Sequence, residues 1–238
     1  MEDDDLGERY ERDGWVGPVR LTTPIDLAGL RAEVLEATPD PADDSVLCPH
    51  LLSPRAARLA ADPALTGCAR RMLGTDRLVV WSSTLFRKEA GAVPFFWHQD
   101  ALSWHVTPMT VVSAWIALEP AGLDNGCVHV VPGSHRQVYN RERKPGGVSS
   151  KTIDDPAFRP DQQRPMELAP GEAFVFSPYL AHCSGANPSK ASRWGMAVRY
   201  ATADVEVAFD KFSIYEDRPE LWRIVDVDQL TPAPSSGG

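Results

Sequence analysis

The residues of this chain that could do the most specific chemistry are His98 and Asp100, followed far downstream by His182 and Arg193. In an extended segment, alternate side chains project to the same side, so His98 and Asp100 can reach one metal ion while Gln99 points away. Two imidazoles and one carboxylate on one face of Fe(II) leave positions open for a cosubstrate and O2. An arginine on a later strand can hold a carboxylate of that cosubstrate through two parallel hydrogen bonds. The pattern favours a mononuclear non-haem iron site.

The second imidazole has rival candidates, because single histidines are more often packed or surface residues than ligands. His129 lies in the middle of an expected strand, where a packed histidine is the common role. His135 ends a Pro-Gly-Ser-His turn, where a structural hydrogen bond is the more typical role. Cys183 would face away from His182 in a strand, so a ligand role for it is not expected. At this point His182, His129 and His135 all stay open.

Several short motifs accompany these residues in a fixed order along most of the chain. They are Tyr10–Val16, Thr84–Lys88, Trp97–Asp100, Ser113–Leu118, Asn125 with Gly126, Val130–His135, and His182–Asn187 leading to Arg193. In this order and spacing, the chain resembles the phytanoyl-CoA dioxygenase-like (PhyH) family of Fe(II)/2-oxoglutarate-dependent oxygenases. Any one motif could be accidental, but the full series is specific.

The resemblance implies a role for each site residue. His98, Asp100 and His182 match the family's iron ligands, and His182 precedes Arg193 by the family's eleven-residue interval. Arg193 matches the residue that pairs with the C5 carboxylate of 2-oxoglutarate. The other expected cosubstrate contacts are Ser184, Thr84 and Trp115. The implied cofactors are therefore Fe(II), 2-oxoglutarate as cosubstrate, and O2.

The resemblance also implies a type of reaction. Related halogenases lack the carboxylate at the position of Asp100 and bind chloride there, so a hydroxylase is expected rather than a halogenase. The expected substrate is a small molecule, free or carrier-bound, whose C–H bond is oxidised in bacterial secondary metabolism. Trp104 and His105 follow the metal motif closely and are the expected substrate contacts, with Arg87 or Lys88 as further candidates.

Two other classes of function stay open. A cupin-like metal-dependent hydrolase or isomerase would use the same barrel and the same three ligands, but it has no need of Arg193. A non-catalytic binding member of the family would be expected to have lost a ligand. None of His98, Asp100 and His182 is missing.

Composition limits the partners. The 24 basic and 33 acidic residues give a net charge of −9, which argues against a nucleic-acid or anionic-membrane partner. The acidic start is unlike a signal peptide, and four cysteines without a CxxC pair fit reduced thiols, so a cytoplasmic location is expected. A monomer or a homodimer is expected.

The expected architecture is one oxygenase domain over residues 1–238. The family resemblance implies a mainly β fold with flanking helices around a double-stranded β-helix, or jelly-roll, core. We expect residues 1–76 to form a helical N-terminal cover and residues 77–202 to form the jelly-roll core. Within that core the polar segment 136–164 is a candidate lid, because long irregular connections inside a domain are usually functional. Residues 203–238 would be a C-terminal extension.

Local signals support this division. Thr23, Ser53 and Asp62 each precede a proline and are the expected N-caps of three helices, the last of which ends at Gly74. After residue 77 the pattern changes to runs of β-branched and aromatic residues, which favour strands. These runs are Leu78–Trp81, Thr84–Phe86, Val111–Leu118, Cys127–Val131, Ala173–Phe176 and Trp194–Tyr200.

Overall fold

Two antiparallel β-sheets face one another in the computed structural model, which describes residues 3–38, 45–143, 151–212, 215 and 218–230. The larger sheet has the order β1 (Trp15–Arg20), β11 (Glu172–Phe176), β6 (Val111–Ala117), β13 (Arg193–Thr202), β3 (Leu78–Lys88), β15 (Val225–Asp226), with β2 (Ser45–Leu47) also paired to β3. The smaller sheet has the order β10 (Arg164–Met166), β7 (Val128–Val130), β12 (His182–Ser184), β4 (Phe95–His98). This arrangement confirms the expected jelly roll.

The larger sheet is buried on both faces, which explains why its strands are nearly continuous apolar runs. In β6 every residue is buried. Its Val112, Ala114 and Ile116 belong to the core between the sheet and the helices, whereas Trp115 and Ala117 belong to the core between the two sheets. The alternation follows from the two-residue period of a strand. The inward face of this sheet therefore supplies one wall of the barrel interior.

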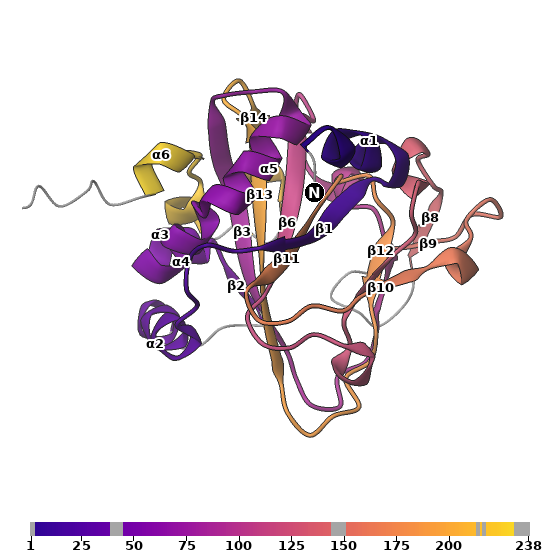
Figure 1. Ribbon diagram of the computed structural model, residues 1–238, viewed down its shortest axis with the longest axis horizontal. Coiled ribbons are helices and arrows are strands. Elements are labelled where there is room, and N and C mark those ends of the chain that lie inside the picture. The colour runs from indigo at the N-terminus through magenta and orange to yellow at the C-terminus, as the bar shows by residue number, and fades with distance from the viewer. Residues whose placement is uncertain (1–2, 39–44, 144–150, 213–214, 216–217, 231–238) are drawn as a thin grey trace, which may run out of the picture.

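Helices cover the outer face of the larger sheet, as Figure 1 shows for α2 (Leu27–Ala37), α3 (Pro49–Leu52), α4 (Pro54–Ala60), α5 (Pro63–Leu73) and α6 (Val227–Leu230). Ser53 and Asp62 cap α4 and α5 as expected, and Gly74 ends α5 with a left-handed φ of 62°. Thr23 was the wrong cap for α2. Asp26 caps that helix by accepting from the Gly29 amide, because α2 begins only at Leu27, after the proline.

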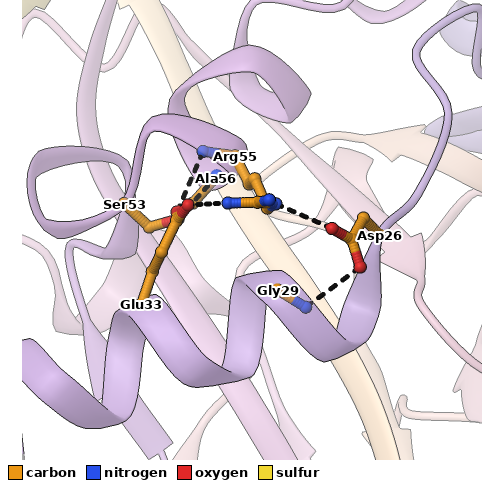
Figure 2. A network of polar contacts seen from close by, with 6 residues as sticks. All are labelled: Asp26, Gly29, Glu33, Ser53, Arg55 and Ala56. Carbon is orange, nitrogen blue, oxygen red and sulfur yellow. Dashed lines mark hydrogen bonds and ion pairs between the residues drawn. The ribbon is translucent and has the colours of Figure 1, made fainter.

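Arg55, in α4, connects that helix to α2 (Figure 2). Its side chain forms ion pairs with Asp26 at the start of α2 and with Glu33 in the middle of α2. The Ser53 hydroxyl, which caps α4, also donates to Glu33. These contacts are partly exposed, so each contributes little free energy alone, but together they fix how α2 lies against α4.

The N-terminal region is not purely helical. Besides α1 (Asp3–Asp13) it contributes β1, which pairs with β11, and β2, which pairs with β3. Both strands join the larger sheet, so the boundary expected between residues 76 and 77 does not separate helices from strands. No described helix has the length and apolar character needed to cross a bilayer.

The segment 136–164 carries short elements of its own. Strands β8 (Arg141–Arg143) and β9 (Lys151–Ile153) pair with each other, and residues 144–150 between them lie outside the described residues. Tyr139 and Ile153 are buried in a small apolar cluster with Trp97 and Phe158. The described part of this segment is therefore packed beside the strand that leads into the metal motif.

Candidate metal and cosubstrate site

Two paired strands of the smaller sheet bring the candidate ligands together. Strands β4 and β12 run antiparallel, and His182 lies directly opposite His98. Gln99 has extended backbone angles and Asp100 opens the short 3-10 helix η1 (Asp100–Ser103). Since His98 and Asp100 are two positions apart along this extended stretch, both side chains turn toward His182.

The three side chains converge on one point. The Asp100 Oδ1 atom lies 3.4 Å from the Nε2 atom of His98 and 3.8 Å from the Nε2 atom of His182. One ligand atom from each residue can be chosen so that all three lie within 4.8 Å of one another. Among the described residues this is the cluster of histidine, cysteine and acidic side chains that could hold a metal. The three donors leave the other side of an ion open, as a reactive iron site requires.

Backbone carbonyls fix the orientation of both imidazoles. The Nδ1 atom of His98 donates to the carbonyl of Phe96, and that of His182 donates to the carbonyl of Leu180, each at 2.9 Å. A carbonyl only accepts, so Nδ1 must carry the proton in both rings. The lone pair of each Nε2 atom is then free and directed at the metal position, as in well-ordered metal sites.

The charges of the site also suit a metal ion. Burial, followed by the charge of His98, lowers the pKa of His182 to about 4, so this imidazole is neutral at pH 7. Burial alone would raise the pKa of Asp100, but His182, His98 and Arg199 outweigh it and hold that pKa well below its usual range. At neutral pH the donor set therefore includes a neutral imidazole from His182 and a carboxylate from Asp100.

The rival histidines lie elsewhere. His129 is opposite Cys183 on the neighbouring strand, and its closest polar contact is the Cys127 sulfur at 3.8 Å. His135 donates from Nε2 to the carbonyl of Glu11 at 3.2 Å, which is the structural hydrogen bond expected for it. Neither belongs to the cluster of potential ligands.

Arg193 begins β13 and is only 5% exposed. Its guanidinium donates from Nη2 to the carbonyl of Gly126 at 2.9 Å and lies 5.0 Å above the ring of Trp115. The Nη1 atom is buried and has no hydrogen-bond partner among the described residues. An unpaired buried donor on a charged group costs free energy, so it marks a place where an anionic ligand fits.

Gly195 allows the indole of Trp115 to lie under that guanidinium. A Cβ atom at position 195 would come within 2.4 Å of the Trp115 Cζ2 atom. Because Gly195 has no Cβ atom, the indole of Trp115 can cross β13 at this position and lie beneath Arg193.

Lys88 is a second cation beside Arg193. The sequence indicated it, with Arg87, only as a further candidate for a substrate contact. The two residues are directly opposite in the pairing of β3 with β13. The Lys88 Nζ atom donates to the Ser184 hydroxyl at 3.2 Å and to the carbonyl of Val93 at 3.0 Å. Burial, followed by the charge of Arg193, lowers the pKa of Lys88 to about 8. Two partly buried cations and a hydroxyl thus lie together with no carboxylate paired to them in the described structure.

Thr84 and Trp104 line a separate cavity together with Arg199. The Thr84 hydroxyl accepts from the Nη1 atom of Arg199 at 2.9 Å, which leaves its own proton available to an acceptor. Ser103 also lines the cavity and belongs to the short helix that Asp100 opens, so the cavity lies beside the metal-binding stretch. His105 is exposed, packs edge-on against Phe212 at 5.4 Å, and is not among the residues that line the cavity.

Gln99 has a positioning role that its place between two ligands did not reveal. Its side chain is fully buried and points away from the metal position. The amide donates to the carbonyls of Gln137 at 2.7 Å and Tyr179 at 2.6 Å, and its oxygen accepts from the Tyr139 amide at 3.0 Å. Gln99 therefore ties the metal-binding stretch to two neighbouring segments.

Comparison with known proteins extends these observations. A family model described as phytanoyl-CoA dioxygenase (PhyH) matches residues 10–195. The ectoine dioxygenase of Bordetella bronchiseptica is 34% identical over 155 residues, which are 57% of this chain and 50% of that protein. The ectoine dioxygenase of Streptomyces coelicolor is 31% identical over 148 residues, 54% of this chain and 50% of that protein. The chain thus spans about half the length of the curated relatives it matches.

Solved structures agree on the fold. The apo form of ThoJ, a non-heme monooxygenase, superposes with a TM-score of 0.74 at 26% identity, covering 85% of this chain and 79% of that one. The apoform of EctD from S. alaskensis superposes with a TM-score of 0.68 at 24% identity, covering 88% of this chain and 80% of that one. The family match covers most of the chain and includes His98, Asp100, His182 and Arg193, so this chain belongs to the phytanoyl-CoA dioxygenase (PhyH) family.

Proposed function

We propose that this chain is an Fe(II)- and 2-oxoglutarate-dependent oxygenase that hydroxylates, or otherwise oxidises, a C–H bond of a small molecule. The observation that carries the proposal is the pairing of two features. Two Nε2 atoms and one carboxylate converge on one point, and an unpaired arginine donor lies buried in the same barrel. A hydrolase or isomerase needs only the first feature.

His98, Asp100 and His182 would hold the iron. The carbonyls of Phe96 and Leu180 keep both imidazole rings oriented before the metal arrives, which lowers the cost of ordering the site. When bound, Fe(II) and 2-oxoglutarate supply the oxidation of the C–H bond by O2, with succinate and CO2 as by-products.

Arg193 would hold the distal carboxylate of 2-oxoglutarate. Its free Nη1 atom can donate to that carboxylate, while the Gly126 carbonyl and the Trp115 ring hold the guanidinium in place. Ser184 and Lys88 support the same assignment, because their hydrogen bond lies beside Arg193. The Thr84 hydroxyl accepts from Arg199 and keeps its own proton to donate, so Thr84 remains a proposed cosubstrate contact as well as part of the cavity wall.

Asp100 favours hydroxylation over halogenation, since its carboxylate fills the position at which a halide would otherwise bind the metal. The names of the relatives support a small-molecule substrate: the two ectoine dioxygenases act on ectoine by name, and the similar solved structures include a monooxygenase. Trp104 supports a substrate contact because it lines the cavity next to the metal ligands. A role in bacterial secondary metabolism, a cytoplasmic location, and a monomeric or homodimeric state remain predictions.

We propose that the described part of the segment 136–164, residues 136–143 and 151–164, covers the site. Arg141 donates to the carbonyl of Leu102 and to the Ser103 hydroxyl, so β8 is tied to the helix that begins with Asp100. Closure over a substrate would then reach the metal ligands directly.

Succinate release tests the proposed function. The protein reconstituted with Fe(II) should convert 2-oxoglutarate to succinate in air, slowly alone and faster with a substrate. Omission of Fe(II) or the variant Asp100→Ala should abolish release. A protein that binds Fe(II) with all three ligands yet yields no succinate in the presence of any small-molecule extract would instead favour the hydrolase or binding-module alternatives.

A further inference from the structure

A cavity of about 250 Å³ lies between β3, β13 and the segment that follows the metal motif. Its walls combine aromatic rings with cations. The aromatic residues are Trp81, Trp104, Phe212 and Tyr215, and the cations are Arg199 and Lys211. None of the described residues that line it is acidic. An apolar, positively charged cavity of this size suits a small organic anion.

Arg199 is the charged residue in the interior of this cavity. Its Nη1 atom donates to the Thr84 hydroxyl at 2.9 Å, and its guanidinium lies 5.5 Å from the ring of Trp104. The Nε atom is buried and has no hydrogen-bond partner in the part of the chain that the structure describes. No ion pair joins Arg199 to a carboxylate of the described chain. A partly buried guanidinium without a counter-ion is costly, and an incoming carboxylate would remove that cost.

A second unpaired donor lies in the same wall. The indole Nε1 atom of Trp81 is buried without a partner among the described residues, on the strand that also carries Thr84. The Ser82 hydroxyl and the Tyr215 hydroxyl in the same wall bond to each other at 2.7 Å. The two buried atoms of the cavity wall that lack a partner in the described structure, Arg199 Nε and Trp81 Nε1, are both donors, which again favours an acceptor-rich ligand.

The cavity also lies where a substrate must lie. Ser103, which lines it, belongs to the same short helix as Asp100, and Trp104 follows directly. Asp100 would neutralise part of the metal's charge, so it is not available to Arg199 once the metal is bound. The cosubstrate's distal carboxylate would be held by Arg193, six residues earlier on β13. Arg199 thus has a charge that neither Asp100, once the metal is bound, nor the distal carboxylate of the cosubstrate satisfies.

We propose that Arg199 binds a carboxylate of the substrate, and that the substrate is a small acid with an apolar, ring-containing body. This inference rests on the proposed function, because it names the substrate class of the same site. The guanidinium fixes the charged end, the rings of Trp81 and Trp104 hold the body, and the exposed Lys211 adds attraction at the rim. Anchoring one end in this way leaves the other end of a short molecule within reach of the metal ligands.

Matched acids and amides test the proposal. The probes are phenylacetate, 3-phenylpropionate, indole-3-acetate and cyclohexanecarboxylate, each beside its primary amide. Binding is measured by calorimetry under anaerobic conditions with Fe(II) and saturating 2-oxoglutarate, so that no turnover occurs. Visible absorption of the same samples reports whether the iron–cosubstrate complex has formed. The variants are Arg199→Gln, Arg199→Lys and, as a matched control on the exposed face of α4, Arg58→Gln.

We expect at least one acid to bind about ten-fold or more tightly than its amide, as expected for a charge-assisted hydrogen bond. Arg199→Gln should remove that preference without changing amide affinity, Arg199→Lys should keep part of it, and Arg58→Gln should keep all of it. A panel in which no acid is preferred by the unaltered protein overturns the proposal, and this comparison needs no variant to fold. A preference for acids over amides that persists in a folded Arg199→Gln protein also overturns the proposal.

The substrate assignment and the proposed function would fail in different ways. If the visible absorption forms but acids and amides bind alike, the substrate assignment fails and the proposed function stands. If acids bind through Arg199 but no iron–cosubstrate absorption forms, the proposed function fails and the carboxylate site stands.

Discussion

At the scale of single residues, a backbone carbonyl keeps the ring proton of each proposed ligand histidine on Nδ1. Because Phe96 and Leu180 accept from Nδ1, the Nε2 atoms of His98 and His182 are available without a tautomer change. Asp100 lies within 4 Å of both, and burial keeps His182 neutral at physiological pH. These hydrogen bonds therefore orient both imidazoles for a divalent metal before it binds. Replacing either histidine with another residue would remove its hydrogen bond.

Replacing His182 tests the choice among the histidines. His182→Ala should weaken Fe(II) binding by more than the roughly 10–100-fold typical of losing a supporting hydrogen bond, because it removes a ligand itself. His129→Ala is the matched control and should bind Fe(II) normally. Anaerobic metal titration measures both. Normal binding by His182→Ala together with a loss in His129→Ala would reverse the assignment.

Arg193 is tested by its geometry rather than its charge. Arg193→Lys keeps a cation but loses the planar fork, and each lost charge-assisted hydrogen bond costs about 1.5–3 kcal/mol. The apparent KM for 2-oxoglutarate should rise roughly ten- to hundred-fold in that variant, and further in Arg193→Ala. Fe(II) affinity should barely change in either one. An unchanged KM in Arg193→Ala would contradict the cosubstrate assignment.

The sequence singled out the proposed ligands and Arg193, with Ser184 and Trp115 as expected cosubstrate contacts, but it did not reveal Arg199 or the contacts of Lys88 and Gln99. His98, Asp100, His182 and Arg193 carry a motif with fixed spacing, which local reading can detect. Lys88, Arg199 and Gln99 act through partners on other strands, often about a hundred residues away, such as Lys88 with Ser184. Such pairs depend on sheet register, and no spacing in the sequence encodes it.

At the scale of elements, Asp62 joins the start of α5 to the chain before α2. Its fully buried carboxylate caps α5 through the Ala64 amide at 2.9 Å. It also accepts from the amides of Thr22 and Thr23 at 2.9 and 2.6 Å. Hydrogen bonds from Thr23 and Thr22 outweigh the effect of burial, which alone would raise the pKa of Asp62, and the net pKa is lowered.

Asp62→Ala should therefore destabilise the fold by roughly 2–4 kcal/mol, since it removes a cap and leaves two amides without an acceptor. Urea unfolding at pH 7 measures the change. Asp204→Ala, at an exposed position, is the matched control and should shift the free energy of unfolding by less than about 0.5 kcal/mol. Equal effects of the two substitutions would show that Asp62 does not join these elements.

The elements that the sequence predicted correctly are those with a strong local signal. Ser53 and Asp62 each stand before a proline at a helix start, and Val111–Leu118 is a long β-branched run that became β6. The strand β2 was missed because it is three residues long and is defined only by its pairing with β3. The prediction of Thr23 as a helix cap was wrong. Its amide and that of Thr22 donate to the carboxylate of Asp62, although the residues there have the same sequence pattern as a cap.

At the scale of the whole molecule, the layer of helices over the larger sheet buries a histidine that has no part in the site. Burial, followed by the charge of Arg223, lowers the pKa of His50 to about 4. Its Nδ1 atom shares a hydrogen bond of 2.6 Å with the Ser83 hydroxyl, and its Nε2 atom has no partner within the described ranges. Protonation of this imidazole inside the fold is therefore unfavourable.

Stability should fall with acid in a window set by His50. Above pH 6.5 the imidazole is neutral whether the chain is folded or unfolded, so it adds no pH dependence. Between pH 6.5 and about 4 only the unfolded chain gains the proton, so the free energy of unfolding decreases by up to about 3 kcal/mol. His50→Asn should be less stable at pH 7.5 but lose less on acidification. Urea unfolding at pH 7.5 and 4.5 compares it with the exposed control His105→Asn, and an equal loss in all three proteins would contradict the prediction.

We infer that His98, Asp100, His182 and Arg193 form one site for iron and 2-oxoglutarate. Visible absorption of the anaerobic protein with Fe(II), titrated with 2-oxoglutarate, tests this inference. We expect a charge-transfer absorption that appears only with both components, saturates at one equivalent of bound iron, and requires much more 2-oxoglutarate in Arg193→Ala. Iron that binds through His98, Asp100 and His182 but gives no such absorption at any 2-oxoglutarate concentration would contradict it.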